Sequence, residues 1–248
     1  MNRILLTLGF ICSCWVPAYA GTGPEPHPTP ELLFRAESLR GKLGVRSADG
    51  KIERELKAGD PLQPGEELFA GKQGQAVLML TENTLIEVQE ETRLRLDSLV
   101  PGPAGEFTTR WTLQGGRILW QVQKLGPAHS AFEVDLGGMA ATVSGSTFET
   151  TLEGDQTDLG VQDGEVAVMG PGPAEKVEGG SHLAFQRGLL QLRRRLDRSE
   201  KERFEGWKTL KAEARENRAK RLRKLNKPKP KRAKKKARTP SLPNPDAL

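Results

Sequence analysis

The stretch that most constrains the fold runs from Phe132 to Phe185 and alternates short apolar segments with turn-forming residues. The segments are rich in Val, Thr, Leu and Phe, a composition typical of β-strands. They are separated by turn signals such as Asp163-Gly164 and Gly179-Gly180. Closely spaced strands with glycine turns predict an all-β domain. The strands expected here are 140–144, 147–152, 159–162 and 165–169.

The same stretch contains no acid–base pair, nucleophile motif or metal-ligand cluster. We therefore expect no catalytic, cofactor-binding or metal-binding residues, and a binding or signal-relay module rather than an enzyme. Its notable residues are Gly145, Gly164 and Gly180, which we expect at positive φ or in close approach to a neighbouring strand. A phosphate-binding role is disfavoured because phosphate loops open a helix, and no helical pattern follows these glycines.

The preceding region also has strand patterns. Gln75–Leu80 is a nearly continuous apolar run, as expected for a strand that is buried on both faces. A run this short does not by itself exclude a helix, but Gly71 and Gly74 before it favour the strand. Thr92–Leu96 and Phe107–Leu113 alternate apolar and polar residues, which predicts half-buried strands. Gly115-Gly116 separates the latter from the alternating segment Arg117–Val122 and predicts a β-hairpin.

A few residues of this β region could carry a function. Trp111 and Trp120 are expected in the core, with a stacked ligand platform as the alternative. His129 and His182 have no partner at metal-ligand spacing, so we expect neither to be functional.

Residues 1–20 have the pattern of an export signal. A positive charge precedes the apolar run 4–16, which is too short to span a membrane. Small residues favour cleavage after Ala20, and lipidation at Cys14 is the alternative. Both cysteines, Cys12 and Cys14, lie in the removed segment, so the mature chain would have no disulfide and no thiolate metal site. We expect an exported protein, periplasmic or envelope-associated, with no membrane span after cleavage.

Several segments together resemble the FecR domain, the periplasmic all-β module of regulators that relay iron-siderophore signals. Ala141–Phe148 (ATVSGSTF) and Val161–Val168 (VQDGEVAV) resemble the closing motifs of that family, apart from Ser146, which stands between Gly145 and Thr147. The resemblance covers about residues 38–185. The other similar segments are Leu43–Val45, Gly59–Leu68 (GDPLQPGEEL), the apolar strand Gln75–Leu80 and Leu113–Trp120 (LQGGRILW).

The resemblance implies a layered or solenoid-like β domain of many short strands, and a non-catalytic regulatory role. Membrane-bound members of the family carry a cytoplasmic anti-sigma region and a membrane helix ahead of this domain. This sequence shows neither feature, so we expect a stand-alone secreted member and leave open whether a sigma factor is involved.

The C-terminal part differs sharply in charge and composition. Residues 193–238 carry 22 Lys/Arg and 6 Asp/Glu, while the whole chain has a net charge of only +6. Residues 186–226 are dense in Leu, Lys, Arg, Glu and Ala, which predicts a basic helix. We expect the helix to fold back on the β domain up to about Leu210 and to project beyond it. Residues 227–248 are rich in Lys and Pro and are expected to be disordered.

An anionic envelope polymer is the expected partner of this tail, through lipopolysaccharide phosphates, anionic lipid head groups or cell-wall acids. A solvated charge run without a specific partner is the alternative. Nucleic acid is disfavoured because the chain carries an export signal and the tail has no aromatic side chains for base stacking. The candidate contacts are Lys227, Lys229, Lys231, Arg232, Lys234, Lys235, Lys236 and Arg238.

The sequence therefore predicts five parts: a signal peptide (1–20), a Pro-rich linker (21–37), a FecR-like β domain (38–185), a basic helix (186–226) and a disordered tail (227–248). In the favoured hypothesis an envelope protein partner binds an exposed strand edge or a groove of the β domain. In the alternative, the protein is a structural envelope anchor whose tail is its only binding element.

Overall fold

The computed structural model describes residues 32–102, 106–124 and 131–225. In these ranges the chain forms 17 strands and one helix, which confirms the predicted all-β fold followed by a helix. The expected signal peptide, His129 and the eight candidate tail cations lie outside the described residues. The elements are β1 (Phe34–Arg40), β2 (Leu43–Arg46), β3 (Glu53–Glu55), β4 (Pro61–Leu62), β5 (Glu67–Ala70), β6 (Gln75–Met79), β7 (Leu85–Val88), β8 (Arg93–Pro101), β9 (Phe107–Gln121), β10 (Ala131–Leu136), β11 (Ala140–Val143), β12 (Thr147–Glu153), β13 (Gln156–Asp163), β14 (Glu165–Met169), β15 (Glu175–Glu178), β16 (Ser181–Gln186), β17 (Leu189–Arg195) and α1 (Arg198–Leu225).

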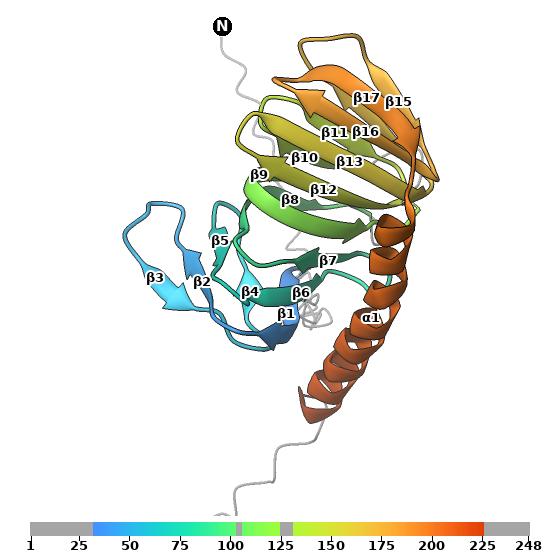
Figure 1. The fold of residues 1–248 in the computed structure, drawn as a ribbon. Coiled ribbons are helices and arrows are strands. Elements are labelled where there is room, and N and C mark those ends of the chain that lie inside the picture. The colour runs from blue at the N-terminus through green and yellow to red at the C-terminus, as the bar shows by residue number, and fades with distance from the viewer. Residues whose placement is uncertain (1–31, 103–105, 125–130, 226–248) are drawn as a thin grey trace, which may run out of the picture. The chain divides into compact units, whose positions relative to one another are not determined.

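The strands pair in two layers, which we call sheet A and sheet B, and β9 belongs to both (Figure 1). The pairing order in sheet A is β4-β1-β6-β7-β9-β12-β13-β16-β17. In sheet B it is β3-β2-β5-β8-β9-β10-β11-β14-β15. All of these pairs are antiparallel except β9 with β10, which run parallel.

The main core lies between the two sheets and is built around aromatic rings. Trp111 and Trp120 are fully buried, as predicted, so neither can serve as a surface platform for a ligand. The Trp111 ring lies 4.8 Å from Phe34 in an edge-on contact, and Trp120 stacks on Phe148 at 5.8 Å. Inward positions of both sheets supply the rest of the cluster, as the period-2 alternation of their strands requires.

The predicted hairpin at Gly115-Gly116 is wrong, because β9 continues through both glycines. Its first half pairs with β8 and β10 in sheet B, and its second half pairs with β7 and β12 in sheet A. Gly116 has φ +96°, and a Cβ there would lie 2.4 Å from Oγ1 of Thr92. The glycine pair therefore bends one strand from sheet B into sheet A instead of closing a turn.

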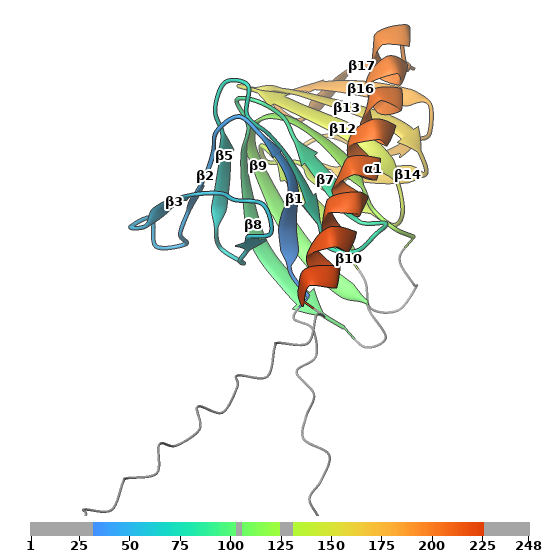
Figure 2. The ribbon, with the colours of Figure 1, turned by 90° about the horizontal axis from the view of Figure 1, so that it is seen from below.

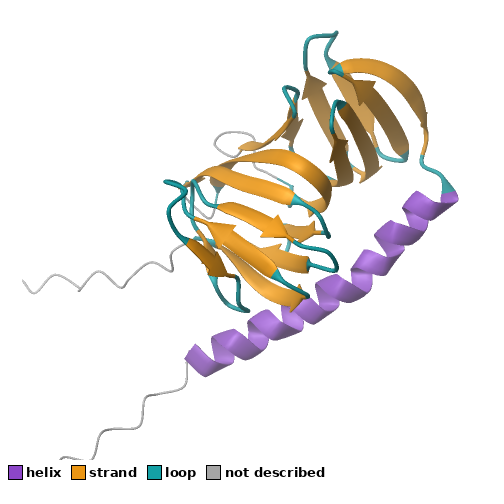
Figure 3. Ribbon diagram, turned by 60° about the vertical axis from the view of Figure 1, so that its left-hand side comes forward, coloured by secondary structure: helices purple, strands orange, loops and turns teal. Residues whose placement is uncertain are grey.

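Helix α1 covers the outer face of sheet A (Figures 2 and 3). A second apolar cluster joins Val77, Met79 and Leu119 of the sheet to Phe204 and Trp207 of the helix. Ala76 and Leu78 of the same strand β6 point into the core between the sheets. The prediction that Gln75–Leu80 is buried on both faces is thus confirmed, and the helix is the layer that covers its second face.

The C-terminal prediction needs two corrections. Residues 189–195 form strand β17 rather than helix, because Arg187 and Gly188 both have positive φ and make a two-residue hairpin turn after β16. The helix beyond Leu210 does not project, since Asn217 and Arg221 contact Glu37 of β1.

The β domain also begins earlier than predicted. Strand β1 starts at Phe34, within the segment expected to be linker, and Phe34 is fully buried against Trp111. Among the described residues, no helix combines the length and the apolar character that a bilayer crossing requires.

Candidate functional site

One row of side chains crosses the outer face of sheet A beneath the helix. The row follows directly from the strand registers, because each member is paired with the next across neighbouring strands. Four of its members are ionisable, which is unusual for a face covered by a helix. The row consists of Ser38, Val77, Glu87, Leu119, Glu149, Gly160, His182 and Arg194.

The helix begins over one end of this row with a capping box. The Asp197 carboxylate accepts a hydrogen bond from the Glu200 backbone N–H at 2.9 Å, and the Glu200 carboxylate accepts one from the Asp197 backbone N–H at 2.7 Å. Ser199 also donates its hydroxyl to Asp197. These bonds satisfy N–H groups that have no partner inside the helix, and so they fix where α1 starts.

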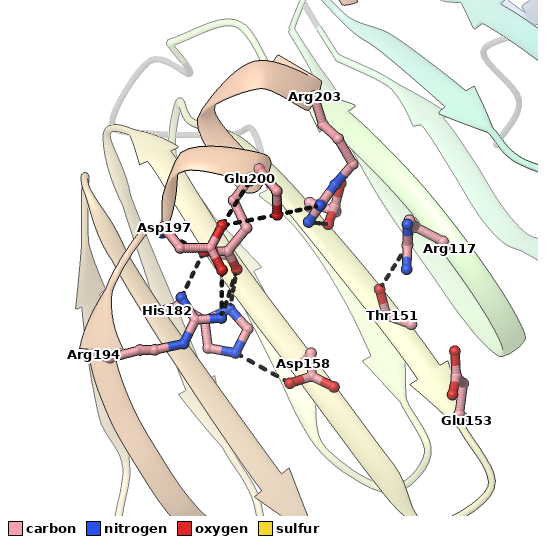
Figure 4. A pocket seen from close by; sticks show the side chains of 12 residues that line it. Arg117, Thr151, Glu153, Asp158, His182, Arg194, Asp197, Glu200 and Arg203 are labelled. Atoms are coloured by element: carbon pink, nitrogen blue, oxygen red, sulfur yellow. Dashed lines mark hydrogen bonds and ion pairs between the residues drawn. The ribbon is translucent and has the colours of Figure 1, made fainter. Parts of the chain in front are cut away.

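Glu200 also joins the helix to the sheet. Arg194 of β17 donates two hydrogen bonds to the Glu200 carboxylate, at 2.6 and 3.0 Å. His182 of β16 places Nδ1 2.6 Å from Oε1 of the same carboxylate and Nε2 3.1 Å from Oδ1 of Asp158. Sequence spacing predicted no partner for His182, and the structure places this buried ring between two carboxylates (Figure 4).

These residues line a polar hollow of about 210 Å³ between the start of α1 and sheet A (Figure 4). Arg203 of the helix makes two hydrogen bonds to Glu149 of β12, at 2.9 and 2.7 Å. Arg117 donates to the Thr151 hydroxyl at 3.3 Å. The charged groups of the hollow are thus largely paired with one another, and this arrangement fastens the helix to the sheet.

Gly160 makes the close approach of the helix possible. A Cβ at this position would lie 3.1 Å from Cδ2 of Leu196 and 3.9 Å from both Oε1 of Glu200 and Nδ1 of His182. The sequence predicted no role for Gly160. A glycine inside an apolar strand is the signal that could have identified this contact.

Two carboxyl groups at the contact between α1 and sheet A have opposite pKa shifts. Burial on its own would raise the pKa of Glu200, but hydrogen bonds from Arg194 and the Asp197 backbone, together with nearby His182, hold it below its ordinary value of 4.5. Burial raises the pKa of Glu87 to about 7, against an opposing hydrogen bond from Gln75. Glu87 Oε2 is buried without a hydrogen-bond partner, so a neutral, protonated carboxyl suits this position.

The histidine of the hollow and the carboxylates around it face one another. His182 faces two carboxylates rather than a hydroxyl nucleophile. In the described ranges, no group of three or more His, Cys, Asp or Glu side chains is arranged to hold a metal ion. The arrangement suits the attachment of α1 to the sheet better than chemistry on a substrate.

The edge strand β17 is a different kind of surface. It pairs with β16 on one side only, and no other described strand pairs with its second edge. Three of its apolar side chains are exposed: Leu189 at 49%, Leu190 at 37% and Leu192 at 47%. Exposed apolar side chains on a strand with free backbone groups are typical of a protein-binding edge.

The three glycines singled out from the sequence all have positive φ. The angles are +137° at Gly145, +80° at Gly164 and +81° at Gly180. The tightest contact is at Gly164, where a Cβ would lie 2.3 Å from the carbonyl oxygen of Gly145. They lie at turns between strands, with Gly145 and Gly164 next to each other, and they do not form a binding site together.

Part of the β body is similar to a known protein family. Residues 66–167 match the family model described as FecR protein. This stretch is similar to FecR domains. The resemblance predicted from the closing motifs is therefore confirmed, and the matched residues include β9 and its pairing partners β7, β8, β10 and β12.

Two crystal structures of a "putative anti-sigma factor" from Parabacteroides distasonis ATCC 8503 are also similar. Each match has a TM-score of 0.43 and 16% sequence identity, and it covers 53% of this chain and 60% of that chain. A comparison with curated proteins found no match.

Proposed function

We propose that this chain is a non-catalytic binding or signal-relay module of the cell envelope. Its FecR domain and the strands around it bind a protein partner, and its basic tail holds the module on anionic envelope polymers. The FecR match supports the regulatory role. The export pattern of residues 1–20 supports the location.

The observation that carries the proposal is the open edge of β17. Most ionisable groups of the polar hollow already pair with each other, whereas this edge offers unpaired backbone groups together with exposed leucines. A partner that adds a strand there would satisfy both features at once, since backbone hydrogen bonds give affinity and side chains give specificity.

The tail is proposed as the second contact. In the sequence, the eight cations from Lys227 to Arg238 follow the end of α1, whose last turn carries Arg223 and Lys224. Each cation near an anionic surface contributes about 1 kcal/mol, and salt weakens the attraction. The contact between Arg221 of α1 and Glu37 of β1 holds the end of the helix at a fixed point of the β body, and this supports a tail that starts from that point.

The alternative function, an envelope anchor with the tail as its only binding element, draws on the same charge run. It is favoured by the way α1 is fastened along sheet A, from His182 at its start to Glu37 near its end. In that case the β body serves as a rigid spacer, and the edge of β17 has no partner.

Two variants separate these functions. A chain that ends at Leu225 keeps every described residue and lacks the tail, while Leu190→Lys with Leu192→Lys alters only the edge. We expect the tail-less chain to lose salt-sensitive binding to lipopolysaccharide and anionic vesicles but to keep its protein partner in envelope cross-linking. The edge variant should do the reverse. If the edge variant still captures every protein that the tail-less chain captures, the proposed binding role of the β body is wrong.

A further inference from the structure

The two sheets have four outer edge strands, and β17 is the one with the least protection against pairing with a further strand. At the opposite end of sheet A, β4 is only two residues long and begins with Pro61. In sheet B the edge strands are β3, with sequence ERE, and β15, with sequence EKVE. Short length, proline and charge are the usual protections of an edge. Strand β17 has seven residues and begins with two exposed leucines.

The side chains of β17 change in character along the strand. Its first four residues are LLQL and its last three are RRR. Arg193 pairs with Glu175, and Arg194 with Glu200, so both arginines are used within the molecule. Arg195 is exposed and has no carboxylate partner among the described residues. The edge therefore offers apolar contacts at one end and an available positive charge at the other.

A second copy of this chain does not complement that edge. If two β17 strands paired in parallel, arginines would lie beside arginines. If they paired antiparallel, arginines would lie opposite leucines. Like charges directly across a strand pair are destabilising, and a charge opposite an apolar side chain gains nothing. A suitable strand carries carboxylates where β17 carries arginines, and apolar side chains where β17 carries leucines.

We propose that β17 binds an extended segment of another protein in which acidic residues are followed by alternating apolar residues. The segment adds as an antiparallel strand, so its first residues lie beside Arg195 and its last beside Leu189. Antiparallel pairing is chosen because it is the more stable arrangement per residue. This inference rests on the proposed function and names the chemistry of the partner at the same edge.

The direct test uses short peptides and the chain that ends at Leu225. The probe is a fluorescent nine-residue peptide with two Glu followed by alternating Val and Thr, and one control has Lys in place of Glu. A second control has the same residues in reverse order. We expect the Glu-first peptide to bind about tenfold more tightly than either control in fluorescence anisotropy at low salt. Equal binding of the three peptides, or no binding, overturns the inference.

Substitutions locate the peptide on the edge. Arg195→Glu should reverse the preference between Glu and Lys peptides, whereas Arg93→Glu, a matched change at an exposed position of β8 in sheet B, should leave it unchanged. Hydrogen exchange should slow at amides of β17 when the Glu-first peptide is bound, and this readout does not depend on either variant being fully stable. If the bound peptide slows hydrogen exchange elsewhere but not in β17, the inference is wrong. It is also wrong if the chain dimerises with rising concentration and Leu192→Lys abolishes the dimer.

Failure of this inference is distinguishable from failure of the proposed function. If the peptides do not bind but cross-linking to an envelope protein still depends on Leu190 and Leu192, the edge is used and only the partner chemistry is wrong. If cross-linking is also insensitive to these leucines, the proposed function of the β body fails with it.

Discussion

Arg221, near the end of α1, hydrogen-bonds through Nε to the Glu37 carboxylate of β1 at 3.2 Å, and through a second nitrogen to the other carboxylate oxygen. Glu37 is only 3% exposed. The pair joins the last described element of the chain to the first. It lies at the opposite end of the helix from Glu200, so α1 is attached to sheet A at both ends.

The first prediction concerns this pair. Arg221→Ala leaves a buried carboxylate without its charge partner, so we expect a loss of about 2–4 kcal/mol in the free energy of unfolding, measured with urea. Arg223→Ala, at an exposed position two residues further on, should change it by less than about 0.5 kcal/mol. The pair has no special importance if the two variants lose the same amount.

A second prediction follows from Glu87. Its pKa of about 7 lies above its ordinary value of 4.5, so the folded chain holds a proton that the unfolded chain releases between these two values. Stability should therefore fall as pH rises from about 4.5 to 7, by an amount on the order of 1–3 kcal/mol. Glu87→Gln should remove this fall and be the more stable protein above pH 7. Parallel pH profiles of urea unfolding for the two proteins would contradict the expectation.

Glu200 gives a prediction of opposite sign. Its pKa is held below 4.5, so the ionised carboxylate stabilises the fold above that pH and loses its effect as pH falls through the folded-state pKa. Glu200→Gln should cost on the order of 2 kcal/mol at pH 7, since Arg194 loses its charge partner. The two proteins should converge in stability at low pH. Glu202→Gln serves as the control, because Glu202 is exposed and pairs with Arg198 of the same helix.

Gly160 tests the close contact between strand and helix. Gly160→Val suits a β-strand by propensity, but its branches would collide with Leu196 and the groups around Glu200. We expect a loss of about 1–3 kcal/mol, together with faster hydrogen exchange in the first turns of α1. If exchange in α1 is unchanged, the helix does not depend on this glycine.

Gly206 provides the opposite case within the helix. It is exposed, and a Cβ there would meet no atom within 4 Å. Gly206→Ala should therefore stabilise the protein by about 0.5–1 kcal/mol, because glycine in a helix interior carries an entropic cost. A thermal melt that shows no increase in Tm would mean that α1 does not limit the stability of the fold.

Much of the β body could be predicted because its signals are local. The alternation in Phe107–Leu113 gave the correct strand, and the apolar run Gln75–Leu80 correctly indicated a strand buried on both faces. Local signals for the C-terminal part were also present but overlooked. Arg187-Gly188 marks a hairpin turn, and the spacing of Asp197 and Glu200 marks a helix start.

The polar hollow could not be predicted because it depends on distant contacts. Asp158 of β13 and His182 of β16 come together only through the register in which these two strands pair. Glu200 joins them only because the helix returns over sheet A. Composition predicted the helix correctly from Arg198 onward but suggested that its basic second half would project. Specific pairs with Glu37 and with the Glu82 backbone determined otherwise.

Strand β9 also bears on how the protein can be divided. Because β9 runs through both layers, with its first half in sheet B and its second half in sheet A, a fragment on either side of it lacks a strand of both layers. Cleavage of the backbone at Gly115-Gly116 would disconnect the layers at the only strand they have in common among the described residues. Attempts to express the N-terminal or C-terminal half alone should therefore give insoluble chains. A chain that is cut between residues 124 and 131 keeps β9 whole, and its two fragments can reassemble when they are expressed together.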